Sequence, residues 1–132
     1  QHCRRQWSLV DDPSLRYTDL AGFDRAMVGW ARERDLPASP PARLLHLHNE
    51  EKVLIAERGN CLLALNFSPD QSYPDYHFPA PEGRYRVVLD SDATEFGGHG
   101  RIDPGVVHHT AGKASELSLY LPSRTALILV PA

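Results

Sequence analysis

The side chains best suited to chemistry gather in one polar segment, residues 90–101. Asp90 and Asp92 open this segment, His99 and Arg101 close it, and three glycines lie between Asp92 and Arg101. A pair of carboxylates near a histidine could serve acid–base or metal chemistry. The same residues suit a strand end followed by a loop in which Asp and Ser bind backbone groups and glycines adopt positive φ. No nucleophile with a base and an orienting group is visible nearby, so we favour the loop and predict no catalytic residue.

Histidines and cysteines raise the question of metal binding or thiol chemistry. The chain has seven histidines and two cysteines, with no CxxC spacing. His46 and His48 would share one face of a strand, whereas the adjacent His108 and His109 would point to opposite faces. A catalytic zinc needs about three converging protein ligands, and no motif supplies that spacing. Cys61 lies in an alternating apolar run and is expected in the core. We therefore predict no metal site and no cofactor.

Aromatic residues provide a further candidate site. Tyr73, Tyr76 and Phe78 lie around Pro74 and Pro79. Flat aromatic rings on a β surface can stack against sugar rings, and they can equally anchor a loop to the core. The pattern alone does not decide between these roles, and core anchoring is the favoured interpretation.

A helix is expected in the first part of the chain. Asp12 can cap free backbone N–H groups, and Pro13 suits the first helical position. Apolar residues then recur at spacings of three and four, which predicts a helix over residues 14–34 with one apolar face. That face consists of Leu20, Phe23, Met27 and Trp30. Gly22 and Gly29 each weaken the helix by about 1 kcal/mol relative to Ala, so the helix needs a partner surface.

Short strands are expected after the proline-rich segment 36–41, which stops helices and makes a stiff connection. Gly59-Asn60 is the signal of a two-residue hairpin, and Leu117, Leu119 and Leu121 alternate with polar residues or Tyr. The predicted strands are 44–48, 52–58, 61–67, 73–78, 85–90, 106–110, 117–121 and 125–130. Many short strands with no helices between them indicate a mainly β fold, an antiparallel sandwich or barrel.

Length and composition narrow the class of protein. The chain has 132 residues, which is the size of one domain, and its 42% hydrophobic and 23% charged residues are typical of a soluble globular protein. A net charge of -3 gives no reason to expect nucleic acid or an anionic membrane as a partner. No apolar run approaches the ~20 residues of a membrane span. Two cysteines suit a reducing compartment, and the cytoplasm is the expected location. The chain opens with Gln1 and has its only methionine at Met27, so we expect a piece of something longer.

An ordered series of short motifs resembles the α-1,4-glucan branching enzymes of the eukaryotic type, within the α-amylase superfamily. Three motifs near the start resemble the end of the catalytic barrel: RRQWSL (4–9), LRY (15–17) and FDRAM (23–27). Six more resemble the C-terminal β domain: ERGN (57–60), NFSP (66–69), SYPDY (72–76), YRVVLDSD (85–92), EFGGH (95–99) and LPSRTA (121–126). The resemblance covers nearly the whole chain, with residues 30–43 matching least.

The resemblance implies a fold and a division of labour. It implies an antiparallel β-sandwich at residues 42–132, preceded at residues 1–36 by one or two helices from the end of a (β/α)8 barrel. In such an enzyme a carboxylate nucleophile takes up a cut α-1,4-glucan segment, a second carboxylate acts as acid and then base, and a 6-hydroxyl accepts the segment to form an α-1,6 branch. The catalytic carboxylates of the family lie upstream, and nothing in this chain corresponds to them.

We therefore expect a non-catalytic, structural C-terminal fragment of a branching enzyme in glycogen or starch biosynthesis. Its expected partners are the missing catalytic barrel, α-glucan, and a second copy bound through the apolar helix face. The candidate glucan or interdomain contacts are Trp7, Tyr73, Tyr76, Asp90, Asp92, His99 and Arg101. The runner-up is a free-standing carbohydrate-binding β-sandwich, and a third class is a small metal-dependent enzyme.

Overall fold

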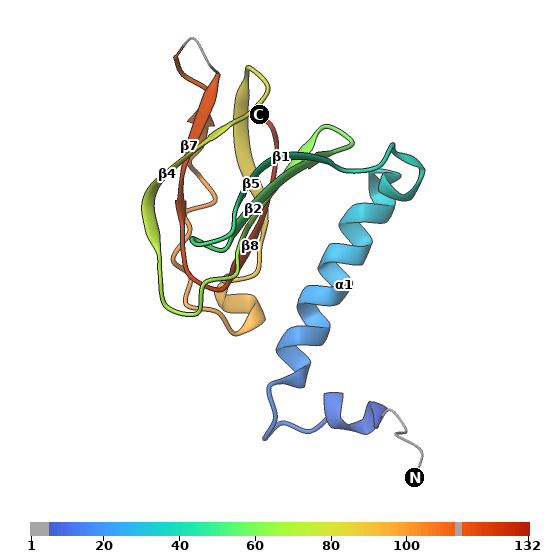
Figure 1. Ribbon diagram of the computed structural model, residues 1–132. Helices are drawn as coiled ribbons and strands as arrows, with labels where there is room; N and C mark the ends of the chain where they lie inside the picture. The colour runs from blue at the N-terminus through green and yellow to red at the C-terminus, as the bar shows by residue number, and fades with distance from the viewer. Residues whose placement is uncertain (1–5, 113–114) are drawn as a thin grey trace.

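One long helix stands beside a body of eight strands in the computed structural model of the chain (Figure 1), which describes residues 6–112 and 115–132. The helix α1 spans Tyr17–Glu33, and short 3-10 turns lie at η1 (Trp7–Val10), η2 (Leu36–Ala38) and η3 (Thr94–Phe96). The strands are β1 (Arg43–His48), β2 (Val53–Arg58), β3 (Cys61–Asn66), β4 (Tyr73–Pro79), β5 (Arg84–Asp90), β6 (Val107–His109), β7 (Glu116–Leu121) and β8 (Thr125–Pro131).

The strands form two antiparallel sheets that face each other. A six-stranded sheet has the order β1-β2-β3-β8-β5-β6, and a two-stranded sheet pairs β4 with β7. In Figure 1 the small sheet stands on the left of the larger one, and α1 stands on the right. The mainly β, antiparallel sandwich predicted from the sequence is confirmed, as is each of its strands to within two residues at either end.

The core lies between the two sheets because the strands alternate in hydrophobicity. Leu117, Leu119 and Leu121 of β7 all face inward and are at most 2% exposed. Opposite them, the large sheet contributes inward side chains from β2, β3, β5 and β8: Val53, Ile55, Leu62, Ala64, Tyr85, Val87, Leu127 and Leu129. Cys61 is also buried, as the sequence predicts. No residue of α1 belongs to this core.

The β2–β3 hairpin turns at Gly59 and Asn60, which have φ values of 55° and 63°. Arg58 pairs with Cys61 across the turn, so the loop has two residues, as predicted. A Cβ on Gly59 would lie 2.7 Å from both the Leu36 side chain and the Ser39 hydroxyl. The hairpin therefore packs tightly against η2 and the segment that follows it.

The helix starts three residues later than the sequence predicts, and Asp12 does not cap it. The Asp12 carboxylate accepts hydrogen bonds from the backbone and hydroxyl groups of Ser14, and the Leu15 N–H donates to the Asp12 carbonyl. These bonds close a local turn that competes with the helix. The helix then begins at Tyr17, with no side-chain hydrogen bond at its N-cap, Arg16.

The residues of the predicted apolar helix face lie in two environments. Phe23 and Trp30 are half-buried, whereas Leu20 is 63% and Met27 37% exposed. The division arises because α1 approaches the body through η3, where Phe23 meets Phe96 edge to face with ring centroids 5.4 Å apart. Within the described part of the chain, no residue of α1 is buried. None of the described helices combines the length and apolar character that a membrane crossing requires.

Candidate functional site

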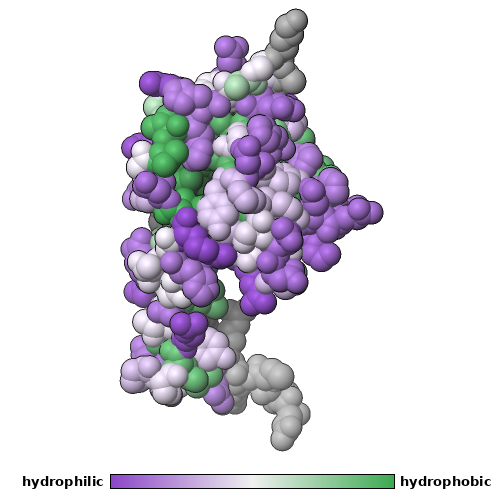
Figure 2. All heavy atoms as spheres, turned by 90° about the vertical axis from the view of Figure 1, so that its left-hand side faces the viewer, coloured by the Kyte–Doolittle hydropathy of each residue, from purple (hydrophilic) through white to green (hydrophobic). Residues whose placement is uncertain are grey.

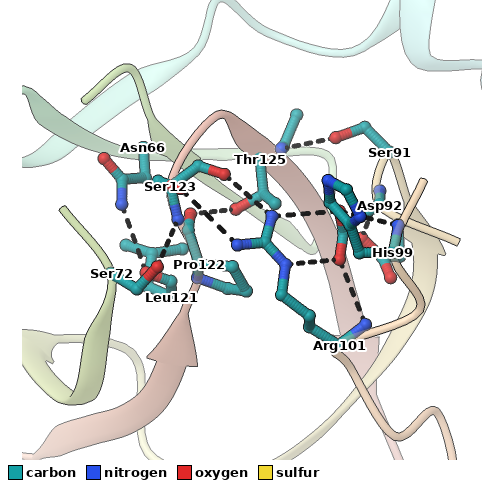
Figure 3. Close-up of polar contacts among 12 residues, drawn as sticks. Asn66, Ser72, Ser91, Asp92, His99, Arg101, Leu121, Pro122, Ser123 and Thr125 are labelled. Carbon is teal, nitrogen blue, oxygen red and sulfur yellow. Dashed lines mark hydrogen bonds and ion pairs between the residues drawn. The ribbon is translucent and has the colours of Figure 1, made fainter. Parts of the chain in front are cut away.

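The polar segment 90–101 forms a loop held together by Asp92 (Figure 3). Asp92 is 5% exposed, and its carboxylate accepts the backbone N–H groups of His99 and Arg101 at 3.2 and 3.1 Å. The Arg101 guanidinium adds two hydrogen bonds, from Nε at 2.9 Å and from an Nη at 3.0 Å. The guanidinium lies between Asp92 and Ser123, whose carbonyl it also reaches at 3.0 Å. The arrangement fastens this loop to the turn between β7 and β8.

The ionisation of Asp92 is set by these partners. Burial by itself raises the pKa of a carboxyl, but the hydrogen bonds from Arg101 and His99 and the charge of Arg101 outweigh burial and lower the pKa of Asp92 to about 2. The pKa of Asp90 shifts the other way, because burial raises it. Asp90 accepts the backbone N–H of Asp92 at 2.8 Å. The described hydrogen bonds to the Asp92 carboxylate all come from groups of the same loop. The carboxylate therefore positions the loop and is not available as a free base.

Two of the three glycines in the loop have the positive φ that the sequence predicts. Gly97 and Gly100 have φ values of 74° and 64°, where side chains other than Gly are strained. A Cβ on Gly98 would lie 2.2 Å from the carbonyl oxygen of Asp92. The loop interpretation of residues 90–101 is therefore confirmed, and the segment needs its glycines for close packing.

Two surface recesses border the loop and share Ser91, Phe96 and Gly97. One has a volume of about 390 Å³ and extends past His99 to Arg124 in the β7–β8 turn. The other, about 320 Å³, extends along the first turns of α1 past Asp19. We call the two together the loop groove. Asp92, His99 and Arg101, three of the residues that the sequence singled out, line it.

Tyr73 and Tyr76 lie away from the loop groove, in a polar cluster between β1 and β4. Tyr76 is buried, and its hydroxyl donates to a Glu51 carboxylate oxygen at 2.7 Å and lies 2.9 Å from Nε2 of His46. Burial, followed by the Glu51 hydrogen bond and charge, raises the pKa of Tyr76. The Tyr73 hydroxyl donates to the Glu51 carbonyl at 3.2 Å. These rings anchor the β1–β2 turn to the small sheet, which is the role that the sequence analysis favours for them.

Some participants were not found from the sequence. Glu51 lies in a turn, and nothing in its neighbourhood marks it as the partner of two tyrosines more than twenty residues away. The Ser123 carbonyl accepts a hydrogen bond from the Arg101 guanidinium. Because every residue has a backbone carbonyl, the sequence does not mark this one. Trp7 begins η1, and its side chain lies outside the described part of the structure. Among residues 6–112 and 115–132, no three His, Cys, Asp or Glu side chains come together as metal ligands.

Comparison with known proteins identifies the family of the β-sandwich. Residues 45–132 match the family described as alpha amylase, C-terminal all-beta domain. The chain belongs to this family. The match begins within β1 and runs through β8, so it contains both sheets of the sandwich, the 90–101 loop and the tyrosine cluster.

Several 1,4-alpha-glucan-branching enzymes are similar in sequence to this chain. The chain is 42% identical over 136 residues to a 1,4-alpha-glucan-branching enzyme of Eremothecium gossypii and 40% identical over 134 residues to one of Rhizophagus irregularis. These alignments cover 98% and 97% of this chain but only 19% and 20% of the relatives. A rice enzyme of the same name, chloroplastic/amyloplastic, is 42% identical over 110 residues, which is 83% of this chain and 13% of that enzyme. The chain thus spans about a fifth, or less, of the length of the curated relatives it matches, and it corresponds to their C-terminal domain.

Proposed function

We propose that this chain serves as the C-terminal part of a 1,4-α-glucan branching enzyme, where it packs against the catalytic barrel and performs no chemistry itself. The observation that carries the proposal is the similarity to branching enzymes over 96–98% of the chain in the fungal relatives. This similarity begins before the all-β domain and includes α1. A free-standing sugar-binding sandwich would not need to share the helix with those enzymes.

The helix supports the proposal because its apolar face is only partly covered. Phe23 packs against Phe96 of the β body and Trp30 is half-buried, whereas four further apolar side chains of α1 stay exposed. They are Tyr17, Leu20, Met27 and Val28, with 47%, 63%, 37% and 44% of their surface exposed. The apolar face of a helix normally packs against another part of the protein. We propose that the preceding barrel covers these exposed side chains.

The outer face of the six-stranded sheet supports the same partner. Antiparallel sheets that face water on one side alternate apolar and polar residues, yet this sheet is also apolar on its outer face. Leu47, Leu54 and Leu65 lie in one cross-strand row there, and Leu44 and Leu47 are 56% and 52% exposed. By contrast, Figure 2, which views the molecule from the side of the small sheet, shows a surface that is mostly hydrophilic, with hydrophobic areas mainly along one flank.

In the intact enzyme, the chemistry would belong to the barrel. A nucleophilic carboxylate there would form the glycosyl-enzyme, and a second carboxylate would act as acid and then base in transferring the segment to a 6-hydroxyl. This chain would hold the last helix of the barrel in place through the Phe23–Phe96 contact and the Asp92-braced loop. We also propose glycogen or starch synthesis in the cytoplasm as the setting, a location supported by the small number of cysteines.

The reading frame upstream of Gln1 tests the proposal. We expect it to continue without interruption into a coding sequence for barrel strands that carry paired carboxylates. A stop codon with an in-frame start immediately before Gln1, confirmed by the N-terminus of the natural protein, would contradict the proposal and favour a free-standing module.

Self-association is proposed for the chain when it is produced alone. Exposed apolar patches as large as that of α1 are unusual on monomers, and a second copy offers the same cover as the barrel. Light scattering should show a dimer or larger species, and Leu20→Asp with Val28→Asp should return it to a monomer. These positions are chosen because Leu20 and Val28 are exposed, whereas Phe23 also packs against Phe96 of the same molecule. A wild-type monomer at high concentration would show that this side of α1 needs no partner.

A further inference from the structure

The loop groove is built like a site for an extended ligand. Its two recesses, about 390 and 320 Å³, join at Ser91, Phe96 and Gly97. The groove therefore continues from the first turns of α1, across the 90–101 loop, to the β7–β8 turn. Gly97 lies close to α1 where the recesses meet, because a Cβ on Gly97 would lie 2.8 Å from the carboxyl carbon of Asp19. A groove that runs along one loop suits a chain molecule better than a compact one.

The charges that line the groove favour a neutral ligand. Arg101 is paired with Asp92, so this arginine contributes little net charge. Of the remaining groups, Arg16 and Arg124 are cationic and Asp19 is anionic. A polyanion would meet the Asp19 carboxylate, and a polycation would meet Arg16 and Arg124. Hydroxyl groups can bind all of these side chains, because they both donate and accept.

An aromatic ring and polar groups with unused hydrogen-bonding capacity complete the site. Phe96 is half-exposed and lines both recesses, and Phe23 packs against it edge to face, which fixes its orientation. Arg124 uses only Nε, on the Pro69 carbonyl, among its contacts with described residues. The His99 ring is exposed and makes no hydrogen bond to a described residue, since His99 contacts Asp92 through its backbone N–H. An apolar face with a few oriented polar groups is the usual composition of a ligand site.

We propose that the loop groove binds a run of α-1,4-linked glucose units, with Phe96 against one sugar face and Arg124 and His99 on the hydroxyls. The proposal rests on the proposed function in one respect, the choice of α-glucan among neutral polyols. Leu20, which the barrel would cover, lines the recess beside α1, so the glucan would occupy mainly the recess that runs from Phe96 past His99 to Arg124. The Asp92–Arg101 pair would act as a positioning element that keeps the loop in shape.

The test is a titration of the ¹⁵N-labelled 132-residue chain with maltoheptaose, followed by NMR, with cellohexaose as the β-1,4-linked control. We expect saturable shifts at the amides of Ser91, Phe96 to His99 and Arg124, and weaker ones with cellohexaose. Phe96→Leu, which keeps an apolar side chain but removes the flat ring, should weaken binding about tenfold, or about 1.4 kcal/mol. His99→Ala, which leaves its backbone bond to Asp92 in place, should weaken binding about threefold. Tyr120→Leu, which changes an exposed aromatic outside the groove, should have no effect.

Three results would overturn the proposal. The first is the absence of saturable shifts up to about 10 mM maltoheptaose, because a Kd above that concentration would be weaker than that of most specific complexes. The second is a set of shifts located elsewhere, or binding by both Phe96→Leu and His99→Ala with wild-type affinity. The third is that the groove amides respond instead to the separately produced upstream part of the protein, which would make the groove a protein interface. The first two results do not depend on the reading frame upstream of Gln1, so a failure of this proposal can be distinguished from a failure of the proposed function.

Discussion

At the scale of single residues, the structure places polar side chains where they hold loops. Four polar residues are buried among those that the structure describes: Asn66, Ser68, Asp92 and Thr125. Asn66 donates to the carbonyls of Gln71 and Leu121, and Thr125 donates to the Pro122 carbonyl at 2.6 Å. Asp92 is the one that also carries a charge, so its ionisation couples the loop to pH.

The pairing of Asp92 predicts a stability that depends on pH. Its native pKa of about 2 lies below the ordinary value of 3.8, so the ionised form stabilises the fold above about pH 4. This contribution, about 2 kcal/mol, is lost as the pH falls from about 4 to about 2. Asp92→Asn should lower the free energy of unfolding by about 2–3 kcal/mol at pH 7 and flatten its pH dependence in that window, as measured by urea denaturation.

The matched control for Asp92 is Glu95→Gln. Glu95 is exposed in the same loop and makes no hydrogen bond to a described residue, so its replacement should leave both the stability and the pH profile unchanged. Equal effects of the two substitutions would mean that the Asp92–Arg101 pair does not hold the loop.

At the scale of elements, two glycines predict opposite outcomes. Gly59 has a φ of 55°, and a Cβ there would press on Leu36 and Ser39. Gly59→Ala should therefore destabilise the chain by about 1–2 kcal/mol. Gly29 lies inside α1 with open space around its Cβ position, and Gly29→Ala should stabilise the helix by up to about 1 kcal/mol. Thermal unfolding followed by circular dichroism measures both effects. A change in Tm of the same sign for the two variants would contradict the local environments described for these glycines.

The strands should fold without the helix, because the core lies within the β domain and no residue of α1 belongs to it. We expect residues 42–132 produced alone to give a β-type circular dichroism spectrum and a cooperative melt. In the full chain, the amides of α1 should exchange with solvent faster than those of β3 and β8, which lie inside the sheet. A disordered spectrum from the shorter piece would mean that the helix is an integral part of the fold.

The elements also show what the sequence could predict. The strands and the Gly59-Asn60 hairpin were predictable because alternation and turn chemistry are local signals. The start of α1 was not, since the Asp12 side chain prefers Ser14 in a local turn. Periodicity identified an apolar side of the helix but not its orientation, which depends on Phe96, more than seventy residues from Phe23.

The candidate site divides in the same way. The loop character of residues 90–101 was predictable from its glycines and aspartates. Its attachment to Ser123 was not, because that bond uses a backbone carbonyl 22 residues away. Tyr73 and Tyr76, candidates for glucan or interdomain contact, lie in a cluster with Glu51 that could not be predicted, because these residues are more than twenty positions apart in the sequence.

At the scale of the whole molecule, the chain is a stable β body joined to a helix that is only partly covered. The body has its own core and a braced loop, whereas the helix and the outer sheet face present apolar residues that need another surface. This asymmetry is what a terminal domain needs if it holds the last helix of a catalytic barrel. Under the proposed function, this chain would have the structural role and the barrel would carry the reacting carboxylates.

The most direct test of this account is an assay of α-1,6 linkage formation from amylose by the purified 132-residue chain. Iodine staining and linkage analysis would compare the chain alone, the separately produced upstream part, and the two mixed. The account predicts no new linkages from the chain alone, and more activity or slower inactivation of the upstream part when the chain is present. Branching by the chain alone that survives repurification would contradict the account.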